Sequence, residues 1–344
     1  MTTQMQPKQI EVKAALEASS AQAQEAARQR ALLRTSGVIA ALVAIVAIVD
    51  VFSHGHFLTE TNLTNVLRQI SDNAILAVGQ TFVIITAGID LSVGSLIQLT
   101  GVVMATFANA MPFDGIPLVA ATLLVGLVVG CFAGFVNAVP VVRLNLPPFI
   151  TTLAMMLMAR GLAFKLSNGQ PVPLNSSAFD TIGTGFFFKV PIAVLWMAVI
   201  VVVFAFLLTR TRFGRYVFAI GGNEEAARLA GINVHFVKTM VYVISGGCAA
   251  VAGLLLMARF SSGSPQTGIG DELHSIAAVV VGGTSLMGGR GSVIATFLGA
   301  LLIGLLNNAM DLLNIESYTQ DIVLGAVILI AVVIDELRKR YLRA

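Results

Sequence analysis

Long apolar segments joined by short polar connections make up the chain from about residue 37 to its end. Several of these segments approach the ~20 residues that an α-helix needs to cross the hydrocarbon of a bilayer. The pattern predicts an all-α, polytopic transmembrane bundle in a single membrane domain, residues 37–344. About ten spans are predicted: residues 37–53, 65–87, 91–110, 117–139, 147–166, 192–209, 237–257, 273–287, 292–310 and 320–336.

The first 36 residues differ from the rest of the chain. They are polar, rich in Ala, Gln and Glu, and contain no apolar run that would serve as the core of a signal peptide. We therefore predict a cytoplasmic tail over residues 1–36.

Composition agrees with an integral membrane protein. Hydrophobic residues make up 56% of the chain and charged residues 11%, against roughly 45–50% and about 25% in ordinary globular domains. The formal net charge is +3. Because the basic residues are sorted by loop, this charge indicates membrane topology and gives no reason to expect a nucleic-acid partner.

The basic residues also predict an orientation. If the N-terminus is inside, all but five of the 21 Lys and Arg residues fall on the cytoplasmic side. The five that fall near outer ends of spans are Arg68, Arg160, Lys165, Lys189 and Arg259. The positive-inside rule expects this asymmetry, which places both termini in the cytoplasm.

A charged insert, Gly214–Val234, lies between two long apolar segments and carries the signals of a short capped helix. Asn223 is a preferred N-cap residue, glutamates occupy the first turn, and Gly231 can close a helix in the left-handed conformation. Such a short helix needs a partner to pack on, so residues 222–231 are predicted to form a cytoplasmic docking helix. Its candidate contact residues are Asn223, Glu224, Glu225, Arg228, Leu229 and Gly231.

Two glycine-rich segments, residues 87–95 and 282–292, break apolar stretches in the two halves of the chain. Corresponding breaks in two weakly repeated halves point to a transport pathway, since unwound backbone at membrane depth is tolerated only beside protein or water. Asp90 is either the N-cap of a helix starting at Leu91 or part of a gate, and both roles are compatible. The gate candidates are Gly88, Asp90, Ser92, Gly94, Gly288 and Gly289.

Neutral polar side chains inside the spans are the candidates for a path taken by a hydroxyl-rich solute. We select Asn137, Asn307 and Asn308, although hydrogen bonding between helices is the alternative role for each of them. Asp72 is the carboxylate that lies furthest inside a span. Because it follows Arg68 by four residues, a local helical ion pair is expected.

The sequence contains no signal for catalysis. No Gly-Lys dipeptide occurs, so the phosphate-binding loop of an ATPase is missing, and no metal-ligand cluster or nucleophile with a paired base is found. The chain is therefore predicted to be a transport subunit with no catalytic or metal site. Its energy would come from another subunit or from an ion gradient. An ion-coupled secondary carrier and a non-transporting membrane scaffold stay open as alternatives.

Three motifs then identify a family resemblance. Thr86–Ser95 (TAGIDLSVGS), Gly221–Asn233 (GGNEEAARLAGIN) and Ala277–Gly289 (AAVVVGGTSLMGG) resemble the ribose, xylose, arabinose and galactose type permease subunit of bacterial ABC importers. The resemblance covers about residue 37 to residue 344 and leaves the tail outside. Branched-chain amino acid permeases share the general membrane fold, so an ABC permease for a non-sugar solute is a further alternative.

The resemblance implies the partners and the cargo. It implies a homodimer in the bacterial inner membrane that moves a ribose-like monosaccharide or polyol. Residues 224–231 would be the coupling helix, seated in a groove of a cytoplasmic ATP-binding subunit. ATP and magnesium would bind that subunit and this chain would bind no cofactor. A periplasmic sugar-binding protein would deliver the cargo to the outer loops.

Overall fold

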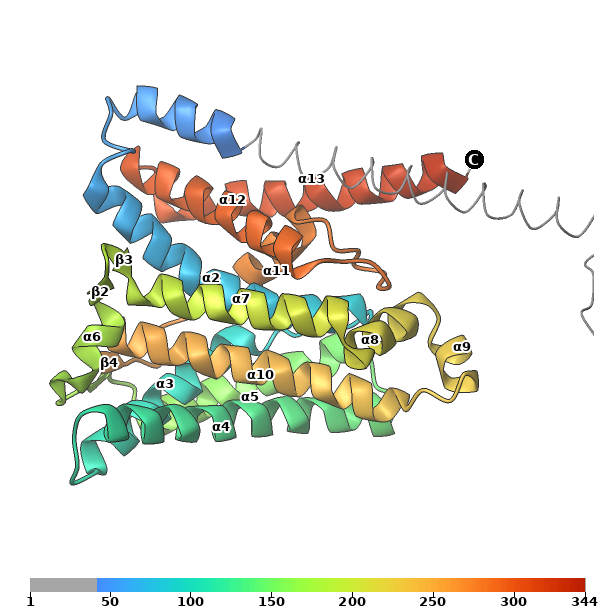
Figure 1. Cartoon of the computed structure of the whole chain (residues 1–344), viewed down its shortest axis with the longest axis horizontal. Helices are drawn as coiled ribbons and strands as arrows, with labels where there is room; N and C mark the ends of the chain where they lie inside the picture. The colour runs from blue at the N-terminus through green and yellow to red at the C-terminus, as the bar shows by residue number, and fades with distance from the viewer. Residues whose placement is uncertain (1–41, 344) are drawn as a thin grey trace, which may run out of the picture.

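The computed structural model describes residues 42–343, so the predicted tail lies outside the described residues. Helices make up most of this part of the chain (Figure 1). After a first helix, Leu42–Phe52, the elements are α2 (Glu60–Ile85), α3 (Val93–Ala110), α4 (Ile116–Arg143), α5 (Pro148–Leu166), β1 (Val172–Pro173), a 3-10 turn (Ser177–Phe179), α6 (Asp180–Gly183), β2 (Phe186–Phe187), β3 (Val190–Pro191), α7 (Ile192–Arg210), α8 (Arg212–Gly222), α9 (Glu224–Leu229), α10 (Val234–Arg259), β4 (Ser262–Gly263), α11 (Asp271–Val281), α12 (Val293–Leu312) and α13 (Ser317–Arg343).

Helix α10 lies at the centre of the bundle and packs against α4, α2 and α3. Its contact with α4 is close because Gly130 and Gly134 of α4 meet the backbone of α10 at Gly246 and Tyr242. Small residues at such spacing let two membrane helices approach closely. Near this contact, Asn137 of α4 and Ser245 of α10 reach the first broken segment.

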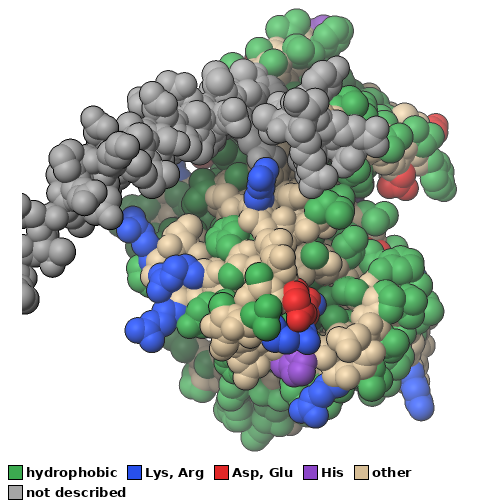
Figure 2. All heavy atoms as spheres, turned by 90° about the vertical axis from the view of Figure 1, so that its right-hand side faces the viewer, with side chains coloured by type: hydrophobic (Ala, Val, Ile, Leu, Met, Phe, Trp, Pro, Cys, Tyr) green, Lys and Arg blue, Asp and Glu red, His purple; other side chains and the backbone are tan. Residues whose placement is uncertain are grey.

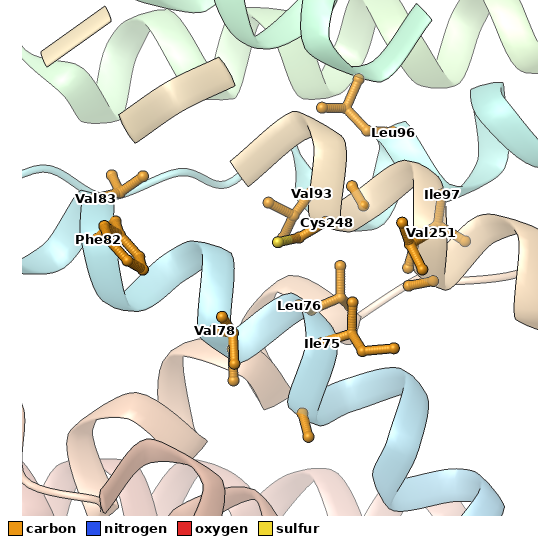
Figure 3. Close-up of a cluster of buried hydrophobic side chains, with 14 of the residues drawn as sticks. Ile75, Leu76, Val78, Phe82, Val83, Val93, Leu96, Ile97, Cys248 and Val251 are labelled. Carbon is orange, nitrogen blue, oxygen red and sulfur yellow. The ribbon is translucent and has the colours of Figure 1, made fainter. Parts of the chain in front are cut away.

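The core fills the space between α2, α3 and α10. Figure 3 shows buried side chains of this cluster, including Leu76, Ile97 and Val251. Helix α3 is mostly buried, α2 is buried almost throughout from Ile70 to Ile85, and α10 is buried from Cys248 to Ala258, as helix segments at the centre of a membrane bundle are. In contrast, α4, α5 and α7 bury only a narrow stripe and expose Leu, Val and Phe elsewhere. The exposed apolar faces are those that suit contact with lipid.

The structure confirms a helical membrane bundle, and it confirms neither the number of ten spans nor the orientation. Among residues 42–343, seven helices are long and apolar enough to cross a membrane: α3, α4, α5, α7, α10, α12 and the first eighteen residues of α13. Each of the other three predicted spans also contains a helix. Within the described residues the first helix has 11 residues, as α11 does, and α2 carries Arg68, Asp72 and Gln80 along its length.

Two small β-sheets among the described residues differ from the all-α prediction. Four strands of two residues each form two small antiparallel sheets, in which β1 pairs with β4 and β2 pairs with β3. All four lie in residues 166–191 and 260–272, which the predicted orientation makes outer loops. These short strand pairs connect the loops at one end of the bundle and take no part in the helical core.

The opposite end of the bundle carries α8 and α9, on the right in Figure 1. Figure 2 shows this face, over which Lys and Arg side chains are distributed. Of the predicted cytoplasmic basic residues, Arg143, Arg210 and Arg228 lie on elements that end or lie at this face. Arg259, predicted outside, ends α10 at the other end of the bundle.

Candidate functional site

Helix α9 is closed at both ends by hydrogen bonds from its own residues. The Asn223 side chain accepts a hydrogen bond of 2.9 Å from the Ala226 amide, which confirms the predicted N-cap. At the other end Gly231 has a φ of +80°, and its amide donates to the Arg228 carbonyl while the Ile232 amide donates to the Ala227 carbonyl. This pair of bonds is a Schellman motif. The predicted capped helix is therefore confirmed.

Ion pairs fasten α9 to the start of α10. Glu224 accepts a hydrogen bond of 3.1 Å from Arg228 and one of 2.7 Å from Lys238 of α10. Burial acts to raise the pKa of the Glu224 carboxyl, but the hydrogen bond and charge of Lys238, together with Arg228, outweigh it and hold this pKa below its ordinary value. Glu224 and Arg228 are thus engaged within the chain.

The outer surface of α9 is free of contacts within the described chain. Ala227 alone of its residues is buried, and the Leu229 side chain is 81% exposed. Glu225 is also exposed. The Leu229 side chain is therefore available for contact with something outside the described residues.

The end of α8 joins α9 to both broken segments. The Gly289 amide donates a hydrogen bond of 2.9 Å to the carbonyl of Ile85, the last residue of α2. Gly221 packs against the same carbonyl so closely that a Cβ atom there would overlap the oxygen. Gly288 and Gly289 have φ values of +83° and +72°, a conformation that favours glycine. We call this meeting of Ile85, Gly221, Gly288 and Gly289 the glycine junction.

Asp90 lies at the centre of a buried polar cluster in the first broken segment. Its Oδ1 accepts hydrogen bonds of 3.0 Å from the Ser92 amide and 2.6 Å from the Ser92 hydroxyl. Its Oδ2 accepts one of 2.8 Å from Ser245 of α10. Asn137 of α4 donates to the Ser92 hydroxyl at 2.8 Å, and the hydroxyl of Tyr242 lies next to Gly88. The cluster therefore ties the segment to α4 and α10.

The structure corrects the predicted cap. The N-cap of α3 is Ser92, and α3 begins at Val93, so Asp90 is not the cap of a helix starting at Leu91. Asp90 instead accepts from the amide two residues on, as in an Asx-turn. Gly94 lies in the first turn of α3, against Glu272 of α11.

The three asparagines chosen for a path lie in different places. Asn137 belongs to the Asp90 cluster. Asn308 exchanges two hydrogen bonds of 2.9 Å with Asn62, so it joins α12 to α2. Asn307 lines a cavity of about 430 Å³ near the other end of the bundle, to which Asp72 also contributes. The structure therefore separates the three residues into a cluster, a helix contact and a cavity wall.

Asp72 does not pair with Arg68 as expected. Its Oδ2 accepts a hydrogen bond of 3.4 Å from Arg259 of α10, whereas Arg68 donates to the Thr184 carbonyl at 2.6 Å and lies over the Phe186 ring. A tertiary partner has replaced the local one.

Sequence reasoning also missed several polar residues. Ser245 and Tyr242 complete the Asp90 cluster, Lys238 holds α9, and Glu272 is a buried carboxylate whose Oε2 has no hydrogen-bond partner among the described residues. The sequence did contain a signal for Glu272, because this carboxylate directly precedes the predicted span 273–287 and so lies at the predicted membrane boundary. Ser245 carries no such signal because serine is common within membrane helices.

Comparison with known proteins identifies the family. The profile of one family, described as the branched-chain amino acid transport system permease component, matches residues 62–332, which include both broken segments and α9. The chain belongs to this permease family. It is thus a multi-pass membrane component of a transport system, and the expectation of a transport subunit in place of an enzyme is confirmed at this level.

Curated members similar to this permease cover nearly all of its membrane region. A ribose import permease protein from Haemophilus influenzae is 44% identical over 301 residues, which are 86% of this chain and 91% of that protein. One from Escherichia coli is 44% identical over 310 residues, 89% of this chain and 95% of that protein. A D-allose transport system permease protein from Escherichia coli is 36% identical over 301 residues, 88% of this chain and 91% of that protein. No solved structure matches the chain.

Proposed function

We propose that the chain is the inner-membrane permease subunit of an ATP-driven, binding-protein-dependent importer of a monosaccharide or related polyol. The similarity to ribose and D-allose permeases along almost their whole length supports a sugar as cargo. The family description names branched-chain amino acids, yet these relatives are named for sugars. Their similarity also favours the importer over an ion-coupled carrier.

Two copies of the chain would form the membrane part of the importer, with an ATPase on the cytoplasmic side and a sugar-binding protein outside. The observation that carries the proposal is α9, with its exposed Leu229 held on a capped and ion-paired helix. Such a surface suits the groove of a soluble partner. Asn223 and Gly231 serve the helix by closing its ends, while Glu225 and Leu229 are free to contact the ATPase.

The link between ATP and transport would run through the glycine junction. A displacement of α9 is passed to α8, whose Gly221 contacts the Ile85 carbonyl with no side chain between them. Gly289 is hydrogen-bonded to the same carbonyl. Because packed backbones deform little and move as units, both broken segments would shift when the ATPase moves α9. ATP would thus favour one of two membrane conformations by binding elsewhere.

The Asp90 cluster would be the fixed side of this gate. Its hydrogen bonds to Ser92 and Ser245 hold the first broken segment on α10, and Asn137 adds α4. A gate needs one anchored edge against which the other moves. The cluster supplies that edge, and the glycine junction would supply the movable one.

The test is uptake into proteoliposomes that contain the chain with its ATPase and binding protein. Leu229→Asp is expected to lower ATP-driven uptake of D-ribose at least about tenfold, since an unpaired carboxylate buried in an interface costs more than a tenfold factor in affinity. Leu229→Met, which keeps an apolar side chain, is the matched control. Both variants are checked for membrane insertion and for co-purification with the ATPase.

Two results would contradict the proposal. Full uptake by Leu229→Asp would show that α9 does not couple the ATPase to transport. Uptake by the chain alone, driven by a proton or sodium gradient without the ATPase, would support the ion-coupled carrier instead.

A further inference from the structure

The cavity of about 430 Å³ lies at the end of the bundle opposite α9, between α2, α10, α11, α12 and the segment 260–270. Most of its wall is polar. Its volume falls within the range of roughly 300–1,000 Å³ that small-molecule sites occupy in proteins. Asp72 and Asn73 of α2, Arg259 of α10 and Asn307 of α12 face it from three helices.

Each acidic side chain in this wall has a basic neighbour. Arg259 lies 3.4 Å from Asp72, and His274 Nδ1 lies 3.6 Å from Asp271, a contact that is an ion pair only when the imidazole is protonated. The side chains of Asp72 and Arg259 are 10% and 28% exposed, so water solvates this pair only in part. Splitting such a pair to bind a charged ligand leaves each ion to find a new partner in a partly dry site. The wall therefore favours a ligand without charge.

The wall also offers hydrogen-bonding groups that the described chain does not use fully. Asn73 Oδ1 is buried and has no hydrogen-bond partner among the described residues. An amide can both donate and accept, and Asn307 supplies a second amide from α12. Arg259 has several N–H groups besides the one bonded to Asp72. Donors and acceptors that converge on one cavity match the hydroxyls of a polyol.

We infer that this cavity is a binding site for an uncharged sugar or polyol in the permease itself, recognised by Asn73, Asn307 and the unused N–H groups of Arg259. The inference rests on the proposed function and adds a place where the cargo is held. The cavity lies at the end of α10 away from α9, which is the outer end if α9 faces the cytoplasm. An imported sugar would therefore reach this cavity before it reaches the broken segments. The ion pair between Asp72 and Arg259 keeps the guanidinium in position.

Cysteine protection tests the site without any ATPase. In membrane vesicles, Asn307→Cys in a chain lacking Cys131 and Cys248 is expected to react with a membrane-impermeant maleimide. Millimolar D-ribose, D-xylose or D-allose is expected to slow that reaction several-fold, and L-leucine is expected to leave it unchanged. Ala309→Cys is the matched control, since Ala309 is on the same helix but is 3% exposed and lies outside the cavity.

Two outcomes of this labelling would overturn the inference. One is labelling of Asn307→Cys that none of the three sugars slows. The other is protection by L-leucine alone, which would mean that a zwitterion splits the ion pair and occupies the cavity.

A second variant separates this site from the proposed function. Asn307→Trp fills the cavity and is expected to lower ATP-driven D-ribose uptake about tenfold or more, as the loss of a hydrogen bond to the ligand would. Co-purification with the ATPase, unchanged from the wild type, excludes misfolding. If Asn307→Trp takes up D-ribose at the wild-type level, the cavity is not on the transport path, and the inferred site is wrong while the proposed importer function is not affected. If the wild type itself moves no sugar, the proposed function fails.

Discussion

Gly221 and Gly222 provide a direct test of the glycine junction, because they are adjacent glycines of α8 with opposite surroundings. A Cβ atom at Gly221 would overlap the Ile85 carbonyl oxygen and lie 2.5 Å from the Gly289 nitrogen. A Cβ atom at Gly222 would meet no atom within 4 Å. The two Gly→Ala substitutions thus change helix propensity alike and differ only in packing.

The expected magnitudes follow from these contacts. Replacing a helical glycine by alanine stabilises a helix by up to about 1 kcal/mol, and Gly222→Ala is expected to show some of this gain. At Gly221 the backbone of α2 or of the second broken segment must shift, and overpacking of this kind costs about 1–3 kcal/mol. The free energy of unfolding of Gly221→Ala is therefore expected to lie about 1–3 kcal/mol below that of Gly222→Ala.

Two measurements check this prediction. Unfolding of the purified chain in detergent can be followed with a thiol-reactive dye, since Cys248 is buried in the core. ATP-driven uptake in proteoliposomes is expected to fall for Gly221→Ala and to stay near the wild-type rate for Gly222→Ala. Equal stability and equal uptake of the two variants would refute the close contact and its place in coupling.

Two further predictions concern the Asp90 cluster and α9. Ser245→Ala removes a hydrogen bond to the buried Asp90 carboxylate and is expected to lower the free energy of unfolding by about 1.5–3 kcal/mol; a loss below about 0.5 kcal/mol in denaturant titrations would contradict it. The lowered pKa of Glu224 means that its stabilising pair with Lys238 is present above the usual glutamate pKa and is lost as pH falls through the folded-state pKa. Lys238→Met is therefore expected to be less stable than the wild type by no more than about 0.5–1 kcal/mol at pH 7, given the exposure of the pair, and the difference should vanish in acid; a pH-independent difference would contradict this.

The parts of the structure that sequence predicted best are those fixed by local signals. Helix α9 follows from Asn223 and Gly231, because an N-cap and a left-handed closing residue act within a few residues of the helix they end. The two broken segments follow from their glycines in the same way. These features need no knowledge of the rest of the fold.

The errors arose where a distant residue decides the local structure. Asp90 was predicted to cap a helix starting at Leu91, to belong to a gate, or both. The cap is wrong because α3 begins at Val93; Ser245, more than 150 residues away, engages one carboxylate oxygen of Asp90 and Ser92 engages the other. Asp72 was assigned to Arg68 by helical spacing, although Arg259 reaches it from another helix. Helical spacing predicts which side chains of one helix can meet. It carries no information about residues of another helix, such as Arg259 of α10, that pack beside them.

The number of spans could not be read from hydropathy for a related reason. Helix α2 is buried almost entirely from Ile70 to its end and carries polar residues that pair with other helices, so its own composition underestimates how well it suits a membrane protein. Helix α11 has 11 residues and is followed by the second broken segment. Its apolar pattern matches a span, while its length reaches only about 16 Å at 1.5 Å per residue.

Helix α2, which ends at the glycine junction, and helix α12, which follows the junction in the sequence, both line the cavity. Helix α2 ends at Ile85, and its Asp72 lies about 20 Å before that end at 1.5 Å per residue. Helix α12 begins just after Gly289 and carries Asn307. In the mechanism that we propose, a push from α8 would act on the end of α2 and on the segment that precedes α12, and these helices would carry the displacement to the cavity wall. Release of the sugar would then need no separate signal, since the same displacement that opens the broken segments also parts Asp72 and Asn73 from Asn307.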